Sequence, residues 1–189
     1  MVTKQEARRL IKEKRKQIDR DWHIRASVEL CERAARWLSD AGFRIVSVFL
    51  GYNGEPLTDF LVAYCLATEK EVYVPVADYK RKILFHARLY DLTRTVPDSY
   101  GIRIPENFEK LVAPKDLTIE VVFCPGLAFD TRGARVGHGE GFYDRFLTGL
   151  KGVAKVGLAF EFQMFQELET EQNDVRMDVI ITEKRLIEI

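Results

Sequence analysis

The sequence has little cysteine. Its 189 residues include three, Cys31, Cys65 and Cys124, which lie far apart and form no CxxC pair. An odd number of scattered cysteines excludes a disulfide framework of the kind that holds small secreted proteins together. Each one lies in an apolar segment, where a free cysteine behaves as a small hydrophobic residue. We therefore expect all three to pack in the core, in a reducing compartment.

Long hydrophobic runs and an excess of charge of either sign are also missing. No apolar run reaches the ~18 residues that a membrane-spanning helix requires. The N-terminal MVTKQEARRLIKEKRKQ contains no apolar signal region, so we expect a cytoplasmic protein without a membrane partner. Lys+Arg and Asp+Glu both number 29, so no global field attracts nucleic acid. Basic residues nevertheless gather in residues 1–25, which carry nine of them against four acidic ones.

Apolar patterning predicts helices and strands in alternation. Thr3 to Glu6 has the spacing of a helix-capping box, and a second helix, with Ile24 and Leu38 on its buried side, ends at Gly42. Buried-strand patterns occupy 44–50 and 119–125, further strands are expected at 71–76, 153–160 and 178–183, and 82–89 alternates like a strand with one face in water. Helices are expected at 57–68 and 141–150. Pro75 indicates that its strand ends there or lies at an edge.

This order of elements predicts the fold class. Strands that alternate with helices form a three-layer α/β/α structure around a mostly parallel sheet, here with an N-terminal helical pair. A chain of this length fits one domain, residues 1–189. Residues 90–115 show no clear pattern and are expected to form a long connection. In such sheets ligands bind beyond the carboxyl ends of the strands.

Glycine is concentrated in one stretch, PGLAFDTRGARVGHGEGFYDRFL (125–147). Of the 12 glycines in the chain, five lie in its first seventeen residues. The stretch lacks the Gly-Lys-Ser/Thr ending of a P-loop and departs from GxGxxG at Phe142. Successive glycine N–H groups before a helix can still bind an anion, and Arg135 adds a planar donor fork that matches phosphate. The stretch indicates either a phosphate cradle or a flexible loop.

Carboxylates near this stretch are candidate ligands of Mg²⁺. Asp144 follows the glycines directly, and either Asp174 or Asp178, before the last core strand, could be a second ligand. Mg²⁺ is usually held by one or two carboxylates, waters and phosphate oxygens. On the first helix Lys4 and Arg8 lie one turn apart. They either stay solvated, contact nucleic acid or reach the phosphates of a nucleotide.

The glycine stretch resembles the signature of the 5-formyltetrahydrofolate cyclo-ligase family, P-G-x-A-F-D-x-x-G-x-R-x-G-x-G-x-G-Y-Y-D. Shorter segments are similar to other motifs of that family in the same order: KQEAR, VFLGYNGEPLT, YGI and NDVRMDVIIT. The resemblance covers nearly the whole chain. It implies an α/β domain related to sugar-phosphate isomerase and CoA-transferase folds.

The resemblance also implies a reaction and its residues. 5-Formyltetrahydrofolate and ATP, with Mg²⁺, give 5,10-methenyltetrahydrofolate, ADP and phosphate through a phosphorylated formyl intermediate. Arg135 and Asp144 would be catalytic, and Asp144 and Asp174 would hold Mg²⁺. The residues implied to contact ATP are Lys4, Arg8, Arg135, Val136, Gly137, His138, Gly139, Glu140, Gly141, Phe142 and Tyr143. Those implied to contact the folate are Leu50, Glu55, His138, Gly139, Glu140, Gly141 and Phe142.

Some positions depart from the family pattern. Glu140 stands where the family often has Lys or Gly, His138 where Tyr or Arg is usual, and Phe142 replaces the first of two tyrosines. Ile104 stands where an acid is typical. Two other functions stay open: an isomerase or CoA transferase on the related fold, and a non-catalytic folate- or RNA-binding protein. We expect a monomer whose partners are 5-formyltetrahydrofolate and ATP, with no nucleic acid.

Overall fold

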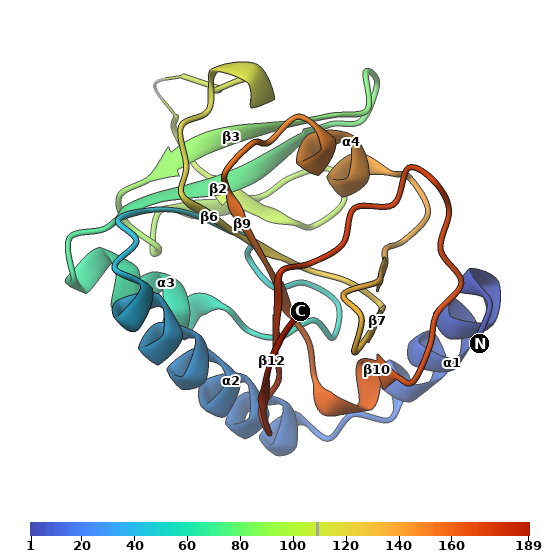
Figure 1. Cartoon of the computed structure of the whole chain (residues 1–189). Coiled ribbons are helices and arrows are strands. Elements are labelled where there is room, and N and C mark those ends of the chain that lie inside the picture. Colours follow the sequence, from blue (N-terminus) through green and yellow to red (C-terminus); the bar gives the residue numbers. More distant parts are fainter. Residues whose placement is uncertain (109) are drawn as a thin grey trace.

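The computed structural model describes residues 1–108 and 110–189 as a layered α/β structure (Figure 1). The helices are α1 (Lys4–Lys16), α2 (Arg20–Ala41), α3 (Asp59–Ala67) and α4 (Phe142–Thr148). The strands are β1 (Ile45–Val48), β2 (Glu71–Asp78), β3 (Ile83–Leu89), β4 (Thr95–Pro97), β5 (Arg103–Pro105), β6 (Val121–Cys124), β7 (Ala128–Asp130), β8 (Arg135–Val136), β9 (Ala154–Leu158), β10 (Met164–Phe165), β11 (Val179–Ile181) and β12 (Leu186–Glu188). Within the described residues no helix is long and apolar enough to cross a membrane.

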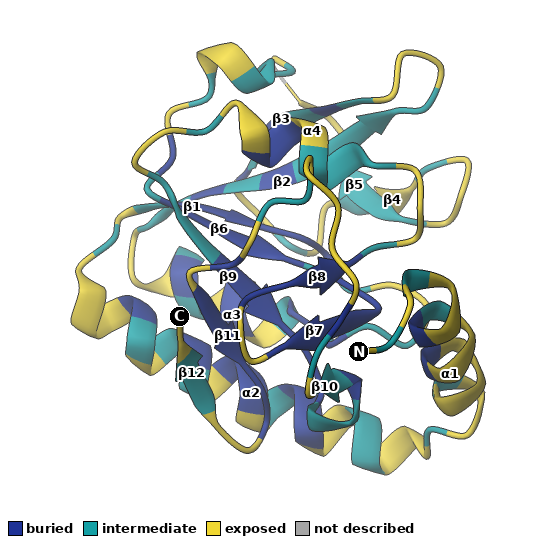
Figure 2. Ribbon diagram, turned by 45° about the vertical axis from the view of Figure 1, so that its right-hand side comes forward, coloured by how far each residue is buried: buried dark blue, intermediate teal, exposed yellow. Residues whose placement is uncertain are grey.

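The central sheet has the strand order β12-β11-β9-β6-β1-β2-β3. Strands β11, β9, β6, β1 and β2 run parallel, and β12 and β3 pair antiparallel at the two edges. α2 and α3 cover one face of this sheet, whereas α4 and the residues around Phe129 and Met177 cover the other. Buried residues accordingly follow the central strands (Figure 2). The predicted α/β class and mostly parallel sheet are confirmed.

The N-terminal helical pair is also confirmed. Thr3 Oγ1 accepts a hydrogen bond from Glu6 N at 3.2 Å, which caps the first turn of α1. Asp19 Oδ1 caps α2 in the same way, 2.9 Å from Trp22 N. α2 ends at Gly42, whose φ of 73° lies in the left-handed region where a helix commonly terminates.

The buried side of α2 differs from the prediction at its start. Ile24 is 38% exposed, whereas Ala26 and Leu30 are buried. Small side chains at Ala26 and Ala34 let the helix approach the rest of the core closely, so the buried stripe passes through these positions. The prediction placed Ile24 on the buried side because it shares the helical spacing of Cys31 and Leu38, and at Ile24 this is wrong.

Strand β2 continues through Pro75 to Asp78, beyond the predicted end. Pro75 lies opposite His86 of β3, but His86 exchanges both of its backbone hydrogen bonds with Val112. The pairing of β2 with β1 has already ended at Tyr73. No partner therefore requires the N–H group that proline lacks. Of the two alternatives that the sequence left at Pro75, the strand does not end there; β2 is an inner strand of the sheet, but at Pro75 it pairs only with β3, as an edge residue does.

A second, smaller sheet in the order β10-β7-β8 carries α1. Ala7 and Ile11, the buried residues of α1, pack against the apolar cluster of this sheet. Val2 bridges to Leu168, because Val2 N donates to Glu167 O and Val2 O accepts from Glu169 N, both at 2.9 Å. The first helix is therefore joined to the second half of the chain, as Figure 1 shows.

All three cysteines are free and buried, as expected. Burial raises the pKa of each thiol to about 12. The thiolate, which is the reactive form, is therefore strongly disfavoured, and the three side chains act as core residues.

Candidate active site

A cavity of about 1280 Å³ opens at the carboxyl ends of the parallel strands. Phe49 and Leu50 directly follow β1, and Pro125 and Gly126 directly follow β6. Every residue to which the resemblance assigned a role lines this cavity: Lys4, Arg8, Leu50, Glu55, Arg135, Val136, Gly137, His138, Gly139, Glu140, Gly141, Phe142, Tyr143, Asp144 and Asp174. The structure thus brings these residues together, while their individual roles stay predictions.

The glycines of the long stretch lie in three places. Gly126 follows β6, where a Cβ would lie 2.6 Å from the Phe129 ring. Gly133, with φ 83°, forms the turn between β7 and β8, where a Cβ would lie 2.6 Å from Met177 O. Gly137, Gly139 and Gly141 follow β8 and line the cavity. We call residues 137–141 the glycine loop. Gly139 and Gly141 have φ of 109° and 68°, values that side chains with a Cβ rarely adopt. The turn glycine thus shapes a hairpin, and the glycine loop forms the wall.

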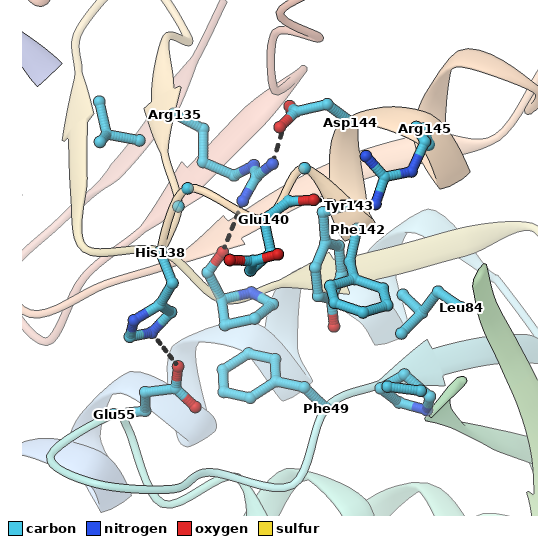
Figure 3. A pocket seen from close by; sticks show the side chains of 18 of the residues that line it. Phe49, Glu55, Leu84, Arg135, His138, Glu140, Phe142, Tyr143, Asp144 and Arg145 are labelled. Carbon is cyan, nitrogen blue, oxygen red and sulfur yellow. Dashed lines mark hydrogen bonds and ion pairs between the residues drawn. The ribbon is translucent and has the colours of Figure 1, made fainter. Parts of the chain in front are cut away.

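Arg135 and Asp144 form an ion pair at the cavity wall (Figure 3). β8 holds Arg135, α4 carries Asp144 in its first turn, and Arg135 Nη2 lies 2.8 Å from Asp144 Oδ1. The Arg135 side chain is only 3% exposed. Its guanidinium lies 5.4 Å from the centre of the Tyr143 ring. A Cβ on Gly137 would lie 3.1 Å from Arg135 Nη1, so the glycine leaves room for the guanidinium.

Two further cations reach the cavity from α1. Lys4 Nζ lies 2.7 Å from Asp174 Oδ2, and both side chains are largely buried. Arg8 Nε donates to Gly137 O at 2.9 Å, and its guanidinium lies beside Gly139. The expected one-turn spacing of Lys4 and Arg8 therefore places both on the face of α1 that borders the glycine loop. Asp174 neutralises one of the two.

Carboxylates that could hold a divalent cation are Asp144 and Asp174. Within residues 1–108 and 110–189, no group of three or more His, Cys, Asp or Glu side chains could hold a metal ion by itself. Among the same residues Asp144 Oδ2 has no hydrogen-bond partner, so this oxygen is available on the cavity wall. This donor set fits Mg²⁺ that receives its other ligands from phosphate oxygens and water.

Asp178 does not line the cavity. Its Oδ2 accepts hydrogen bonds from Lys155 N and Lys155 Nζ at 2.8 and 2.9 Å, and the side chain is half exposed. Of the two carboxylates that the sequence left as alternatives, the structure brings Asp174 to the cavity and leaves Asp178 at the start of β11.

The loop after β1 faces the glycine loop across the cavity. Glu55 Oε2 accepts from Tyr52 N at 3.2 Å, and its Oε1 lies 3.7 Å from His138 Nε2 (Figure 3). His138 is about half exposed, whereas the Glu55 side chain is 11% exposed. Leu50 is buried beneath this loop. His138 and Glu55 therefore form a polar contact between the two walls.

Glu140 points toward the turn between β2 and β3. Its Oε2 lies 2.9 Å from Lys82 Nζ, and the pair is more than half exposed. The hydrogen bond and charge of Lys82 lower the pKa of the Glu140 carboxyl. The negative charge that departs from the family pattern is thus partly neutralised by a lysine from another element.

Aromatic side chains form a further part of the cavity wall. Phe142 was expected at the site, whereas the sequence analysis assigned no role to Tyr79 or Tyr100. The rings of Tyr79 and Tyr100 lie 4.1 Å apart, and the Phe142 ring meets Tyr79 edge-on at 5.8 Å. Tyr79 Oη donates to Asp98 Oδ2 at 2.7 Å. Burial, followed by this carboxylate, raises the pKa of Tyr79, so the phenol stays protonated. The position of Tyr79 after a predicted strand and the YGI motif that begins at Tyr100 could have indicated these two residues, whereas Asp98 lies in the segment without a pattern.

The fold and cavity define an α/β protein with one set of converging cations at the carboxyl ends of a parallel sheet, the usual place for a ligand site in this class. A model of the 5-formyltetrahydrofolate cyclo-ligase family matches residues 1–183. The chain belongs to this family, whose known activity is the ATP-dependent cyclisation of 5-formyltetrahydrofolate to 5,10-methenyltetrahydrofolate. The alternative functions that the sequence left open are not favoured.

Individual relatives agree with the family. The chain is 30% identical over 146 residues to the 5-formyltetrahydrofolate cyclo-ligase of Escherichia coli K12, covering 76% of this chain and 80% of the relative. It is 29% identical over 163 residues to a probable 5-formyltetrahydrofolate cyclo-ligase of Caenorhabditis elegans, covering 81% and 78%. The solved structure of Aquifex aeolicus 5,10-methenyltetrahydrofolate synthetase matches with a TM-score of 0.83 and 28% identity, over 98% of this chain and 92% of that one.

Proposed function

We propose that this cavity binds ATP and 5-formyltetrahydrofolate side by side and catalyses the cyclisation through the residues named above. The observation that carries the proposal is the convergence of Lys4, Arg8 and the Arg135–Asp144 pair on the glycine loop. Three cations around one loop suit a polyphosphate, which carries several negative charges in a row.

The ATP phosphates would lie along the glycine loop. Arg8 already donates to Gly137 O, so its guanidinium is oriented beside the loop before a ligand arrives. Arg135 is buried and held by Asp144. Side chains fixed in this way lose little conformational freedom on binding, so more of the interaction energy contributes to affinity.

The folate would lie between the glycine loop and the loop after β1. Leu50 and Glu55 would contact it from one wall and residues 138–142 from the other. The Glu55 carboxylate accepts hydrogen bonds from N–H groups, and a reduced pterin carries several of these. The contact of Glu55 with His138 at 3.7 Å lies between the two binding regions.

The chemistry requires no nucleophile from the protein. The formyl oxygen attacks the γ-phosphorus and ADP leaves, which gives an imidate-type phosphate on the formyl carbon. N10 of the folate then forms a bond to this carbon, the C–O bond to phosphate breaks, and N10 loses its proton. Phosphoryl transfer depends mainly on positioning and charge neutralisation, which Arg135, Lys4 and Arg8 supply. Holding both substrates in one site is worth up to ~7–11 kcal/mol in ideal geometry.

Asp144 and Asp174 would hold Mg²⁺ at the phosphates. When bound, Mg²⁺ would supply positive charge that neutralises the negative charge developing during transfer. Asp144 would use Oδ2, because Oδ1 accepts from Arg135. Lys4 forms an ion pair with Asp174. For Asp174 to bind the metal ion, Lys4 would have to shift from this carboxylate toward the phosphates.

The test is the near-UV absorbance rise of methenyltetrahydrofolate, with and without MgATP. We expect an ATP-dependent rise in the parent and a fall in rate of about 10²-fold or more in Asp144→Asn, the size found when one group that stabilises a transition state is removed. Asp178→Asn is the matched control, since Asp178 lies outside the cavity, and should keep the parental rate. A folded parent without ATP-dependent turnover would contradict the proposal.

The proposal includes a monomeric, cytoplasmic protein that does not bind nucleic acid. One chain supplies every residue to which the resemblance assigns a role, so a single copy would suffice for the proposed reaction. Light scattering coupled to size exclusion, at the concentration of the assay, measures the oligomeric state directly. A dimer whose dissociation abolishes activity would contradict the monomer.

A further inference from the structure

Arg145 joins two segments of the chain beside the glycine loop and, like that loop, lines the cavity. It is carried by α4, one residue after Asp144, and lies beside Phe142 in Figure 3. Its Nε donates to Lys82 O at 3.1 Å, and its Nη2 donates to Glu140 O at 2.8 Å. One guanidinium thus joins the turn between β2 and β3 to the glycine loop through two backbone carbonyls.

The local backbone is arranged around this guanidinium. Lys82 has a φ of 55°, in the left-handed region, and its carbonyl accepts from Arg145. A Cβ on Gly141 would lie 2.8 Å from Arg145 Nη1, so only glycine at position 141 leaves room for the side chain as it lies. The guanidinium also lies 5.6 Å from the centre of the Phe142 ring. These contacts define one position for Arg145.

The neighbouring ion pair of Lys82 with Glu140 contributes less. Both side chains are more than half exposed, and exposed pairs of this kind are usually worth little. The two bonds of Arg145 are charge-assisted and end on the backbone, so they restrain the path of the loop whatever side chain stands at position 140.

We propose that Arg145 is a positioning residue that holds the glycine loop in the shape that receives the nucleotide. Gly139 and Gly141 give the loop many conformations in the absence of a restraint. A loop that is already held pays less ordering entropy on binding. The consequence for ATP rests on the proposed function; the effect on the loop itself does not.

The first experiment measures amide hydrogen exchange of residues 137–141 in the ligand-free protein. Arg145→Gln should exchange there about threefold to tenfold faster than the parent, as the loss of one or two hydrogen bonds predicts. In Arg145→Lys the same amides should exchange nearly as fast as in Arg145→Gln, because an ammonium lacks the planar fork that reaches both carbonyls. Arg36→Gln, which removes an exposed arginine of α2 paired with Glu32, is the control and should match the parent.

The second experiment measures the kinetics of the same variants. Arg145→Gln and Arg145→Lys should raise the KM for ATP about threefold to tenfold, with a smaller change in kcat and in the KM for the folate. A parental KM for ATP in Arg145→Lys would show that the positive charge alone matters and would overturn the proposal, as would parental exchange of residues 137–141 in both variants. If the parent shows no turnover, the proposed function fails, and the exchange result still decides the role of Arg145.

Discussion

At the scale of the residue, the Arg135–Asp144 pair determines which substitutions can be interpreted. Arg135 is almost completely buried, and its Nε has no hydrogen-bond partner among the described residues. Removing the Asp144 side chain would leave a buried cation without a counter-charge, which typically destabilises a protein by ~3–5 kcal/mol. Asparagine also lacks the charge but keeps an oxygen that accepts from Arg135 Nη2, so Asp144→Asn should destabilise the protein less than Asp144→Ala.

Glu140→Lys should lower the KM for ATP. The substitution replaces a negative charge by a positive one beside the proposed phosphates, and the loop keeps its path because Arg145 bonds to the backbone of residue 140. Steady-state kinetics at low and moderate salt test this, since salt weakens interactions between exposed charges. An unchanged or higher KM would show that the side chain at position 140 stays directed at Lys82, away from the ligand.

His86 should make the protein less stable in acid. It is completely buried, its Nδ1 has no partner within the described chain, and burial lowers its pKa to about 3. An unfolded histidine has a pKa near 6.5, so between these values the unfolded state binds the extra proton. His86 therefore costs no stability above pH ~6.5. Below that pH it lowers the free energy of unfolding by up to ~1.4 kcal/mol per pH unit as the pH decreases toward 3.

The matching variant is His86→Gln, which keeps a polar group near Ser47 Oγ, the partner of His86 Nε2 at 3.0 Å. Glutamine does not titrate, so the difference in unfolding free energy between parent and variant should decrease from pH 7 to pH 5. Urea unfolding at several pH values measures it. A difference that is constant with pH would mean that His86 is not the group responsible.

At the scale of the element, the β7–β8 hairpin depends on one buried carboxylate. Asp130 is 1% exposed; its Oδ1 accepts from Arg132 N and Ala134 N at 2.9 Å, and its Oδ2 accepts from Leu168 N at 3.0 Å. Asp130→Ala should lower the unfolding free energy by ~3 kcal/mol, because it leaves buried N–H groups unpaired. Asp130→Asn keeps one acceptor oxygen and should lower the unfolding free energy by less.

Urea unfolding of both variants tests this order, with Asp40→Ala at the exposed end of α2 as a control. Equal losses in Asp130→Ala and Asp130→Asn would show that the charge, and not the set of hydrogen bonds, holds the hairpin.

The sequence predicted the elements whose periodicity or capping is strong and missed the short ones. β6 is a continuous apolar run, and Gly42 ends α2, so both were found from the sequence. β8 and β10 contain two residues each, too few to show a period of two. β4 and β5 pair within the segment that had no pattern, because contacts with the rest of the fold, such as the bidentate pair of Arg103 with Asp59, hold them there.

At the scale of the whole molecule, the packing of α1 controls the position of two cations of the candidate site. Ile11 is 2% exposed and packs on the small sheet, while Lys4 and Arg8 of the same helix face the cavity. Ile11→Ala should destabilise the protein by ~2–4 kcal/mol and also raise the KM for ATP, because a loosened helix no longer fixes both cations.

Leu10→Ala is the control on the same helix, since Leu10 is 38% exposed and should be replaced at little cost. Thermal unfolding and ATP kinetics of the two variants provide the comparison. An Ile11→Ala protein with reduced stability but a parental KM for ATP would show that the packing of α1 does not control nucleotide binding.

Most of the candidate site could be predicted because its residues occur in a long motif with a physical reason for each type. Gly137, Arg135 and Asp144 lie within ten residues, so their proximity follows from the chain itself. The contact of Lys4 with Asp174 joins residues 170 positions apart, and only the resemblance placed both at one site. The pairing of Glu140 with Lys82 could not be predicted, since nothing in the sequence relates the turn between β2 and β3 to the glycine loop.

The bridge between Val2 and Leu168 has a consequence for biosynthesis. The first helix leaves the ribosome early, but the strands against which it packs and the segment that pairs with Val2 are made much later. Until then α1 has no partner for Ala7 and Ile11, and a helix of this length is marginal by itself in water. The ligand cavity therefore closes only after Leu168 has been made, and a nascent chain stalled before β7 and β8 would expose the apolar stripe of α1 to chaperones.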